Sequence, residues 1–286
     1  MGVKWYQIRV TTPESVLEFK IKPNSTGRQL FNQVCTTIGL REVWYFGLQY
    51  TDSKGLVKWV KLNKKISCKS KEARLDYTFK VKFYPEEVSE ELIQEVTQRL
   101  FYFEVKSHII SGEIYTSADC ALLLASFQAL IRHGKYDPKV HTRGYLNIPN
   151  YIPDHILKQY TWTTEEWEDK IAKWHSQHGD MSKQDAIMEY LKVAQDLEMY
   201  GAVYFPIKNV KQTPLWLGVD SLGINIYEAE DRLAPKISFP WNEIRKLAYS
   251  HSKFTVKPTD TQGKVSPSCI IRYLVYSALN HFSREF

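Results

Sequence analysis

Seven lysines lie between residues 53 and 71, and this stretch contains no acidic residue. Ammonium groups that converge without acidic partners repel one another unless an anion neutralises them. The cluster therefore predicts a site for a phosphoinositide headgroup or an anionic membrane leaflet, where each lysine contributes about 1 kcal/mol. A fully solvated face is the alternative that the residues leave open. The cluster consists of Lys54, Lys58, Lys61, Lys64, Lys65, Lys69 and Lys71.

Residues that could support catalysis or hold a metal are sparse. The chain has no glycine-rich phosphate loop, no Gly-x-Ser-x-Gly turn and no His-Glu-x-x-His motif. His175 and His178 have the spacing of helical metal ligands, but no third ligand accompanies them, so we expect a solvated or capping role. Because an active site needs converging titratable groups, we predict that the chain is not an enzyme and needs no cofactor or metal.

The charge of the 286-residue chain is uneven, although its net value is +6. Residues 1–84 hold 16 Lys/Arg against 6 Asp/Glu, residues 85–200 hold 11 against 19, and residues 201–286 hold 11 against 7. A basic, an acidic and a mildly basic segment predict three modules with these boundaries. The period of the hydrophobic pattern changes at the same places.

The first segment alternates at period two, which is typical of strands. Its expected order is two strands, a helix that Thr26 caps and Gly39 ends, and three more strands, as in a small ubiquitin-like roll. The expected strands cover residues 5–10, 16–21, 46–50, 57–60 and 77–83.

The second segment has the 3.6-residue period of helices and predicts an all-helical bundle. Ser89 caps the first expected helix, whose apolar face comprises Leu92, Ile93, Val96, Leu100 and Phe103. Further helices are expected around residues 121–127, after Thr163, and over residues 183–200. We expect six tryptophans to lie in the core or between lobes, because aromatic rings dominate protein cores. They are Trp44, Trp59, Trp167, Trp174, Trp216 and Trp241.

The third segment returns to short strands, expected at residues 203–207, 215–219, 223–227, 237–239 and 253–256. The last apolar run, residues 269–281, is predicted to be a helix because Ser266 and Pro267 suit a helix start. Two alternatives remain open for this run. One is a strand, since Ile270, Ile271 and Val275 favour strands, and the other is a disordered tail.

Four separated cysteines indicate a reducing compartment, and no apolar stretch is long enough to span a membrane. The beginning of the chain does not resemble a signal peptide. We therefore expect a cytoplasmic protein.

Four motifs resemble the FERM domain of the ezrin–radixin–moesin and merlin family: residues 40–50 (LREVWYFGLQY), 83–87 (FYPEE), 189–201 (EYLKVAQDLEMYG) and 239–245 (FPWNEIR). The resemblance runs from about Lys4 to Asp260. It implies an α+β fold, a three-lobed cloverleaf of a ubiquitin-like roll, an acyl-CoA-binding-protein-like helical bundle and a pleckstrin- or phosphotyrosine-binding-like barrel.

The resemblance also implies a function: a non-enzymatic adaptor at the plasma membrane and cell cortex that connects membrane to cytoskeleton. It implies a phosphatidylinositol bisphosphate site that matches Lys54, Lys61, Asn63, Lys64 and Lys65. It further implies a groove that receives the juxtamembrane tails of adhesion receptors by strand addition. The strand side of that groove matches Asn242, Glu243, Ile244, Arg245, Lys246 and Leu247.

After Asp260 the chain no longer matches the family, so we expect a shortened third lobe with unpaired strand edges. We also expect no direct binding to actin, because no segment resembles the family's actin-binding tail. A cytosolic protein-binding scaffold with weak lipid affinity and no actin linkage is the alternative function. Nucleic acid is not an expected partner.

Overall fold

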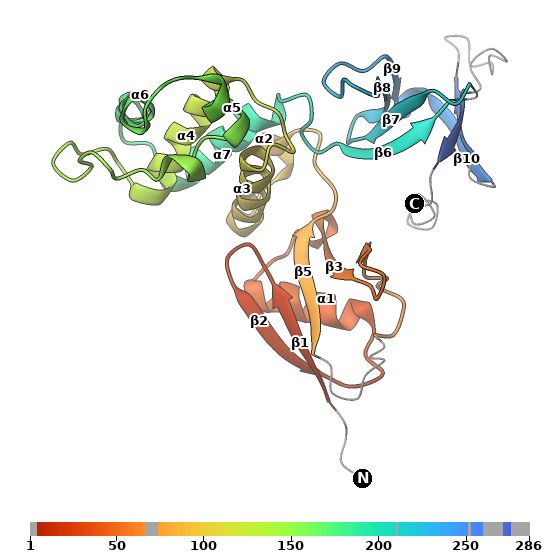
Figure 1. The fold of residues 1–286 in the computed structure, drawn as a ribbon. Helices are drawn as coiled ribbons and strands as arrows, with labels where there is room; N and C mark the ends of the chain where they lie inside the picture. The colour runs from red at the N-terminus through yellow and green to blue at the C-terminus, as the bar shows by residue number, and fades with distance from the viewer. Residues whose placement is uncertain (1–4, 67–73, 210, 251–252, 260–270, 276–286) are drawn as a thin grey trace. The chain divides into compact units, whose positions relative to one another are not determined.

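The computed structural model describes residues 5–66, 74–209, 211–250, 253–259 and 271–275. The chain forms two compact units, Met1–Asp196 and Leu197–Phe286. The first unit contains a mixed sheet with its helix and a set of further helices, and the second contains a second sheet (Figure 1).

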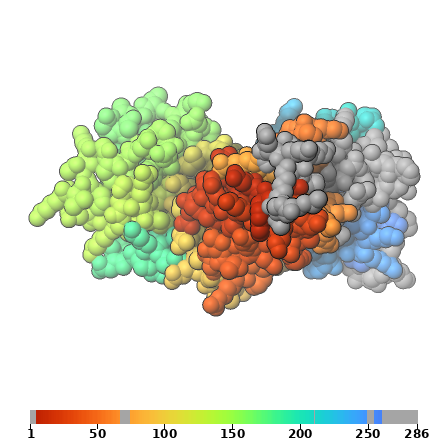
Figure 2. Space-filling model, turned by 90° about the horizontal axis from the view of Figure 1, so that it is seen from below, coloured from red at the N-terminus to blue at the C-terminus, as the bar shows by residue number. Residues whose placement is uncertain are grey.

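The first sheet has the strand order β2-β1-β5-β3-β4, with β1 parallel to β5 and the other neighbours antiparallel. Helix α1 lies across one face (Figure 1), where the ring of Phe31 stacks on that of Phe79. Residues 5–66 form a rounded surface in the space-filling view (Figure 2). The elements are β1 (Tyr6–Thr11), β2 (Val16–Ile21), α1 (Gly27–Ile38), β3 (Phe46–Thr51), β4 (Val57–Trp59) and β5 (Leu75–Val81), which confirms the predicted order.

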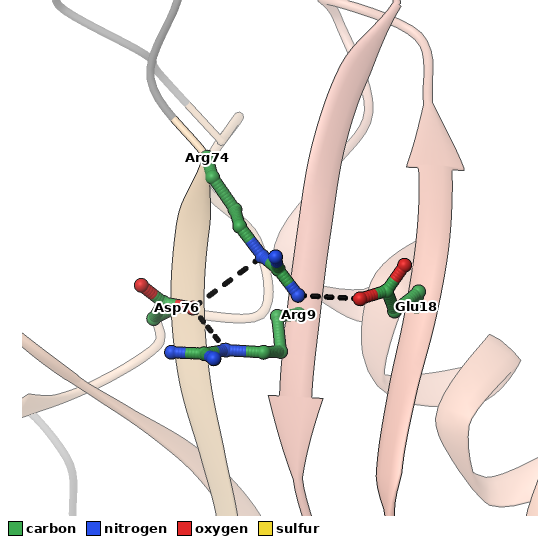
Figure 3. A network of polar contacts seen from close by, with 4 residues as sticks. All are labelled: Arg9, Glu18, Arg74 and Asp76. Atoms are coloured by element: carbon green, nitrogen blue, oxygen red, sulfur yellow. Dashed lines mark hydrogen bonds and ion pairs between the residues drawn. The ribbon is translucent and has the colours of Figure 1, made fainter.

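The outer face of this sheet carries an ion-pair network (Figure 3). Arg9 Nε lies 2.6 Å from Asp76 Oδ1, and Arg74 Nη2 lies 2.5 Å from Glu18 Oε1. The network ties β2, β1 and the start of β5 together. Its members are exposed, so water and salt keep each pair's contribution to stability below about 1 kcal/mol.

The helical part begins with a break that the sequence analysis missed. The predicted helix from Ser89 through Phe103 is two helices, because backbone N–H groups of Ile93 and Gln94 donate to the buried carboxylate of Glu42 instead of continuing the helix. Ile93 is consequently exposed. The helices are α2 (Val88–Glu91), α3 (Glu95–Ile110), α4 (Ala118–His133), α5 (Asp154–Gln159), α6 (Thr164–Gln177) and α7 (Lys183–Gln195), with 3-10 turns η1 (Val43–Tyr45) and η2 (Ile148–Asn150).

Other helical predictions are partly confirmed. Thr163 caps α6 in a capping box with Glu166, as its position before an apolar stripe predicts. Helix α7 ends at Gln195 rather than at Tyr200. Trp167 is buried, whereas Trp44 and Trp174 are 60% and 43% exposed, so these two do not lie in the core.

The second unit is a seven-stranded sheet with the order β10-β11-β12-β6-β7-β8-β9. Alternate residues of its strands form one apolar core that includes Leu217, Ile226 and Val256. Among the described residues β9 and β10 are the two edges, so the sheet does not close into a barrel. The elements are β6 (Val203–Lys208), β7 (Pro214–Val219), β8 (Gly223–Glu228), β9 (Ile237–Pro240), η3 (Trp241–Glu243), β10 (Ile244–Ser250), β11 (Lys253–Pro258) and β12 (Ile271–Val275).

The predicted closing helix is wrong for residues 271–275, which form strand β12. This strand pairs with β11 on one side and β6 on the other. Without β12, the facing edges of β11 and β6 would leave backbone N–H and C=O groups unpaired. Pairing with both edges therefore stabilises the extended conformation of residues 271–275 more than one apolar stripe would stabilise a helix. Residues 269–270 and 276–281 of the predicted helix lie outside the described residues.

Candidate functional site

The centre of the lysine cluster is a tight turn, residues 61–65, which we call the lysine turn. Lys64 N donates to Lys61 O at 3.0 Å and closes it. Lys65 forms an isolated β-bridge with Thr26, and Ile66 N donates to Ser25 O at 2.8 Å. The turn is therefore fixed to the loop that precedes α1, although these segments are far apart in the sequence.

The start of α1 holds the turn from the other side. Gly27 N donates to Lys64 O and Arg28 N donates to Leu62 O, both at 2.9 Å. A Cβ on Gly27 would lie 2.6 Å from Val60 Cγ1 and 2.8 Å from Lys61 O. Only glycine allows this approach, so the residue at position 27 determines where the lysines lie.

The charges of the site come from side chains. Two N–H groups in the first turn of α1 donate to the lysine turn and a third donates to the Thr26 side chain, so these amides are not available to an external anion. Four predicted site residues, Lys61, Asn63, Lys64 and Lys65, are exposed together on the turn. Such ammonium groups attract phosphate oxygens as point charges.

The other lysines of the cluster differ in their surroundings. Lys54 is exposed at the tip of the β3–β4 hairpin. Lys58 forms an ion pair with Asp52, an acid just outside the acid-free stretch. The charge of Lys58 is thus balanced within the chain. Lys69 and Lys71 lie outside the described residues.

Arg28 is a candidate that the sequence analysis missed. Its side chain is exposed, and its backbone N–H is bonded to the lysine turn. It is more than 30 positions away from the lysine turn in the chain, and only the backbone bonds between α1 and the turn bring it close. No local pattern could have identified it.

The predicted receptor-tail residues lie on η3 and on the edge strand β10. Lys246, Leu247 and Arg245 are exposed, and a bulge between Ile244 and Lys246 leaves Arg245 outside the regular pairing with β11. Within the described part of the second unit, the other side of β10 has no strand beside it. An edge of this kind can accept an extended peptide as an additional strand.

Turn η3 gives this edge a fixed starting point. Trp241 Nε1 donates to Asp220 O at 3.1 Å, and Trp241 N donates to Leu222 O at 3.1 Å. Thr259 N donates to Glu243 O at 2.8 Å, which joins the turn to the end of β11. The exposed Asn242 and Glu243 are therefore held at the beginning of the edge.

The two histidines with metal-ligand spacing have structural partners. His175 is buried, so its predicted solvated role is wrong; its Nε2 donates to Gly134 O at 2.8 Å. His178 Nε2 lies 2.8 Å from Ser126 Oγ. The described residues contain no group of three His, Cys, Asp or Glu side chains that could hold a metal ion.

Three family descriptions match consecutive parts of the chain. Residues 10–72 match the FERM N-terminal domain, residues 87–205 the FERM central domain, and residues 209–280 the FERM C-terminal PH-like domain. The chain belongs to the FERM family. The third match extends past Asp260, so the prediction that the resemblance ends there is wrong; β12 lies within the matched range.

A solved structure similar to this FERM chain is the complex of the FERM and C-terminal domains of Drosophila Merlin. It is 42% identical, has a TM-score of 0.90, and the match covers 98% of this chain and 93% of that one. The MyTH4-FERM MF2 domain of Dictyostelium discoideum myosin VII has a TM-score of 0.72 at 14% identity, over 99% of this chain and 57% of that one. The C-terminal MyTH4-FERM domain of human myosin 7b, solved with the harmonin-a PDZ3 domain, has a TM-score of 0.68 at 14% identity, over 98% and 58%. The two myosin matches concern the fold alone.

No helix in the described part of this FERM chain is long and apolar enough to cross a membrane. Membership of the family, with merlin as a similar structure, supports a linker module between membrane and cytoskeleton.

Proposed function

We propose that this FERM domain is a peripheral adaptor that binds phosphoinositide-containing plasma membrane through the lysine turn and receptor tails through β10. The observation that carries the lipid part is the fixed cluster of Lys61, Lys64 and Lys65, whose charges have no acidic neighbour within the turn. Each ammonium near an anionic leaflet contributes about 1 kcal/mol. Lys54 and Asn63 are the remaining proposed lipid ligands.

The receptor part of the proposal rests on the open edge of β10. A juxtamembrane tail that adds as a strand would gain backbone hydrogen bonds, while Ile244 and Leu247 offer apolar contact and Lys246 attracts acidic side chains. The merlin structure contains a C-terminal domain bound to its FERM domain. A segment of that kind is a second candidate ligand for this chain.

Sedimentation with liposomes tests the lipid part. Lys61→Glu with Lys64→Glu should abolish binding to phosphatidylcholine vesicles that contain phosphatidylinositol bisphosphate, because two attractive charges become repulsive. The matched control is Lys139→Glu with Lys173→Glu, which changes the net charge equally at exposed positions in the helical part. The control should bind like the wild type, and both variants should keep its Tm, since exposed substitutions change stability by under about 0.5 kcal/mol.

The alternative is a cytosolic scaffold with weak lipid affinity and no actin linkage. Wild-type protein that stays in the supernatant at physiological salt, yet binds a receptor-tail peptide, would favour the scaffold. Equal binding by the wild type and the Lys61/Lys64 variant would reject the lysine turn as the lipid site. The predicted absence of direct actin binding stays a prediction, and co-sedimentation with filaments measures it.

A further inference from the structure

The tip of the β3–β4 hairpin presents two neighbouring apolar side chains to solvent. Leu56 is 53% exposed and Val57 is 62% exposed. Moving these two aliphatic side chains from water into an apolar environment would be favourable. We propose that this tip is a membrane-inserting element, in which Leu56 and Val57 enter the headgroup–acyl boundary of the anionic leaflet that the lysine turn binds. The inference rests on the proposed lipid-binding function.

The tip is rigid, so its apolar residues cannot fold back onto the sheet. Asp52 N donates to Leu56 O and Gly55 N to Asp52 O, both at 2.9 Å. The carboxylate of Asp52 accepts from Lys54 N at 2.8 Å and from Leu56 N at 3.0 Å, and it pairs with Lys58. Gly55 has a φ of +77°, a backbone conformation that glycine adopts without strain. Insertion would therefore require no ordering of the loop.

The charges around the tip select an anionic lipid surface. Lys54 is exposed beside the apolar pair, and the one acid of the tip, Asp52, is neutralised by Lys58. The hydrogen bond from Lys58, followed by those from the backbone amides, lowers the pKa of Asp52 to about 2. This ion pair thus persists in the acidic layer at a charged membrane, so the carboxylate goes on holding the Lys54 and Leu56 amides there.

One face of β4 continues the same amphipathic pattern. Alternation along a strand places Val57 and Trp59 on one face, and Lys82 Nζ lies 5.5 Å from the centre of the Trp59 ring. Tryptophan and lysine are residues that sit at membrane interfaces. An extended chain spans at most about 3.6 Å per residue, so Val57 and Lys61, four positions apart, lie within about 15 Å of each other. A bilayer that the lysine turn binds is therefore within reach of the tip.

The sheet itself supplies a matched control. β2 and β4 are its two opposite edges, and Val16 on β2 is 55% exposed, close to the exposure of Val57. No basic cluster flanks Val16 in the sequence. The proposal therefore predicts that a polar substitution weakens vesicle binding at the β4 edge and leaves it unchanged at the β2 edge.

The experiment compares Leu56→Ser with Val57→Ser against Val16→Ser in the full chain. The probes are vesicles of phosphatidylcholine with phosphatidylinositol bisphosphate, and soluble inositol trisphosphate, which presents the same phosphates without acyl chains. We expect the double variant to bind vesicles at least about tenfold more weakly, since even partial burial of two aliphatic side chains contributes that much. It should bind inositol trisphosphate within about twofold of the wild type, with unchanged Tm, and Val16→Ser should match the wild type with both probes.

Each other outcome overturns the proposal in a recognisable way. Vesicle binding that is unchanged in the double variant but lost in the Lys61/Lys64 variant rejects insertion and leaves the lysine turn as the lipid site. An equal loss of vesicle binding in Val16→Ser would show that any exposed apolar residue contributes to binding, and it would reject a specific role for the hairpin tip. Wild-type protein that binds inositol trisphosphate but not vesicles rejects insertion, and protein that binds neither probe overturns the proposed lipid function as well.

Discussion

The imidazole rings of His141 and His175 lie with their centroids 5.5 Å apart in the helical part of the chain. His141 Nδ1 accepts the backbone N–H of Asp137 at 2.9 Å, so this nitrogen carries no proton. His175 Nε2 donates to Gly134 O, and its Nδ1 lies 3.3 Å from the hydroxyl of Tyr145. The loop that follows α4 therefore gives each ring a backbone hydrogen-bond partner.

This arrangement predicts that the helical part loses stability in acid. Burial lowers the pKa of His175 by more than the hydrogen bond to Gly134 O raises it, and burial and then Arg132 lower the pKa of His133. The unfolded chain, with histidine pKa values near 6.5, thus binds more protons than the folded one, and stability falls as the pH drops below about 6.5.

Thermal unfolding at pH 7.5 and pH 5.5 measures this effect. His175→Gln is the informative variant, because a glutamine amide can donate to Gly134 O but does not titrate. We expect a smaller decrease in Tm on acidification for His175→Gln than for the wild type. Equal decreases would show that other groups cause the acid sensitivity.

Gly27→Ala should both destabilise the first unit and weaken lipid binding. The added Cβ meets Val60 Cγ1 at 2.6 Å and the backbone oxygen of Lys61 at 2.8 Å, and a backbone atom cannot move without shifting the lysine turn. Overpacking of this kind costs about 1–3 kcal/mol of unfolding free energy. Urea unfolding and vesicle sedimentation measure the two effects. Asn32→Ala, at an exposed position of the same helix, should change neither.

Glu168→Ala should be among the more destabilising substitutions in α6. Its carboxylate is 4% exposed and accepts the N–H groups of Gly144, at 2.7 and 3.0 Å, and of Leu146, at 3.1 Å. Removal leaves two backbone donors unsatisfied, at about 1–3 kcal/mol for each that stays buried. The neighbouring Asp169→Ala removes an exposed pair with Arg143 and should cost under about 1 kcal/mol. Similar unfolding free energies for the two variants would contradict this role.

Local patterns in the sequence were sufficient where the local period and the tertiary environment agree. The alternation of residues 16–21 and the Thr26 cap of α1 correspond directly to β2 and its following helix. The prediction failed where a distant partner decides. The amides of Ile93 and Gln94 leave the helix because Glu42, some 50 positions earlier, accepts them. No pattern in the residues around Ile93 and Gln94 indicates that Glu42 accepts their N–H groups.

The candidate site shows the same division. The lysines at 61, 64 and 65 were identified because they are contiguous and free of acids. Arg28 was missed because only backbone bonds across the unit bring it to the turn. Residues 271–275 carry both a helical stripe and strand-forming residues, and the choice depends on the edges of β6 and β11 rather than on the segment itself.

Hydrogen exchange can test the position of β12 in the second sheet. Lys253 faces Leu274 on one side, and Val275 faces Ile207 on the other. Because β12 is paired on both sides, its backbone amides should exchange more slowly than those of the edge strand β10, which has one neighbour among the described residues. A receptor-tail peptide that adds beside β10 should slow exchange in residues 244–250 and leave β12 unchanged. Protection that appears first in β12 would place the peptide between β11 and β6, and the strand pairing described for residues 271–275 would then be replaced by the peptide.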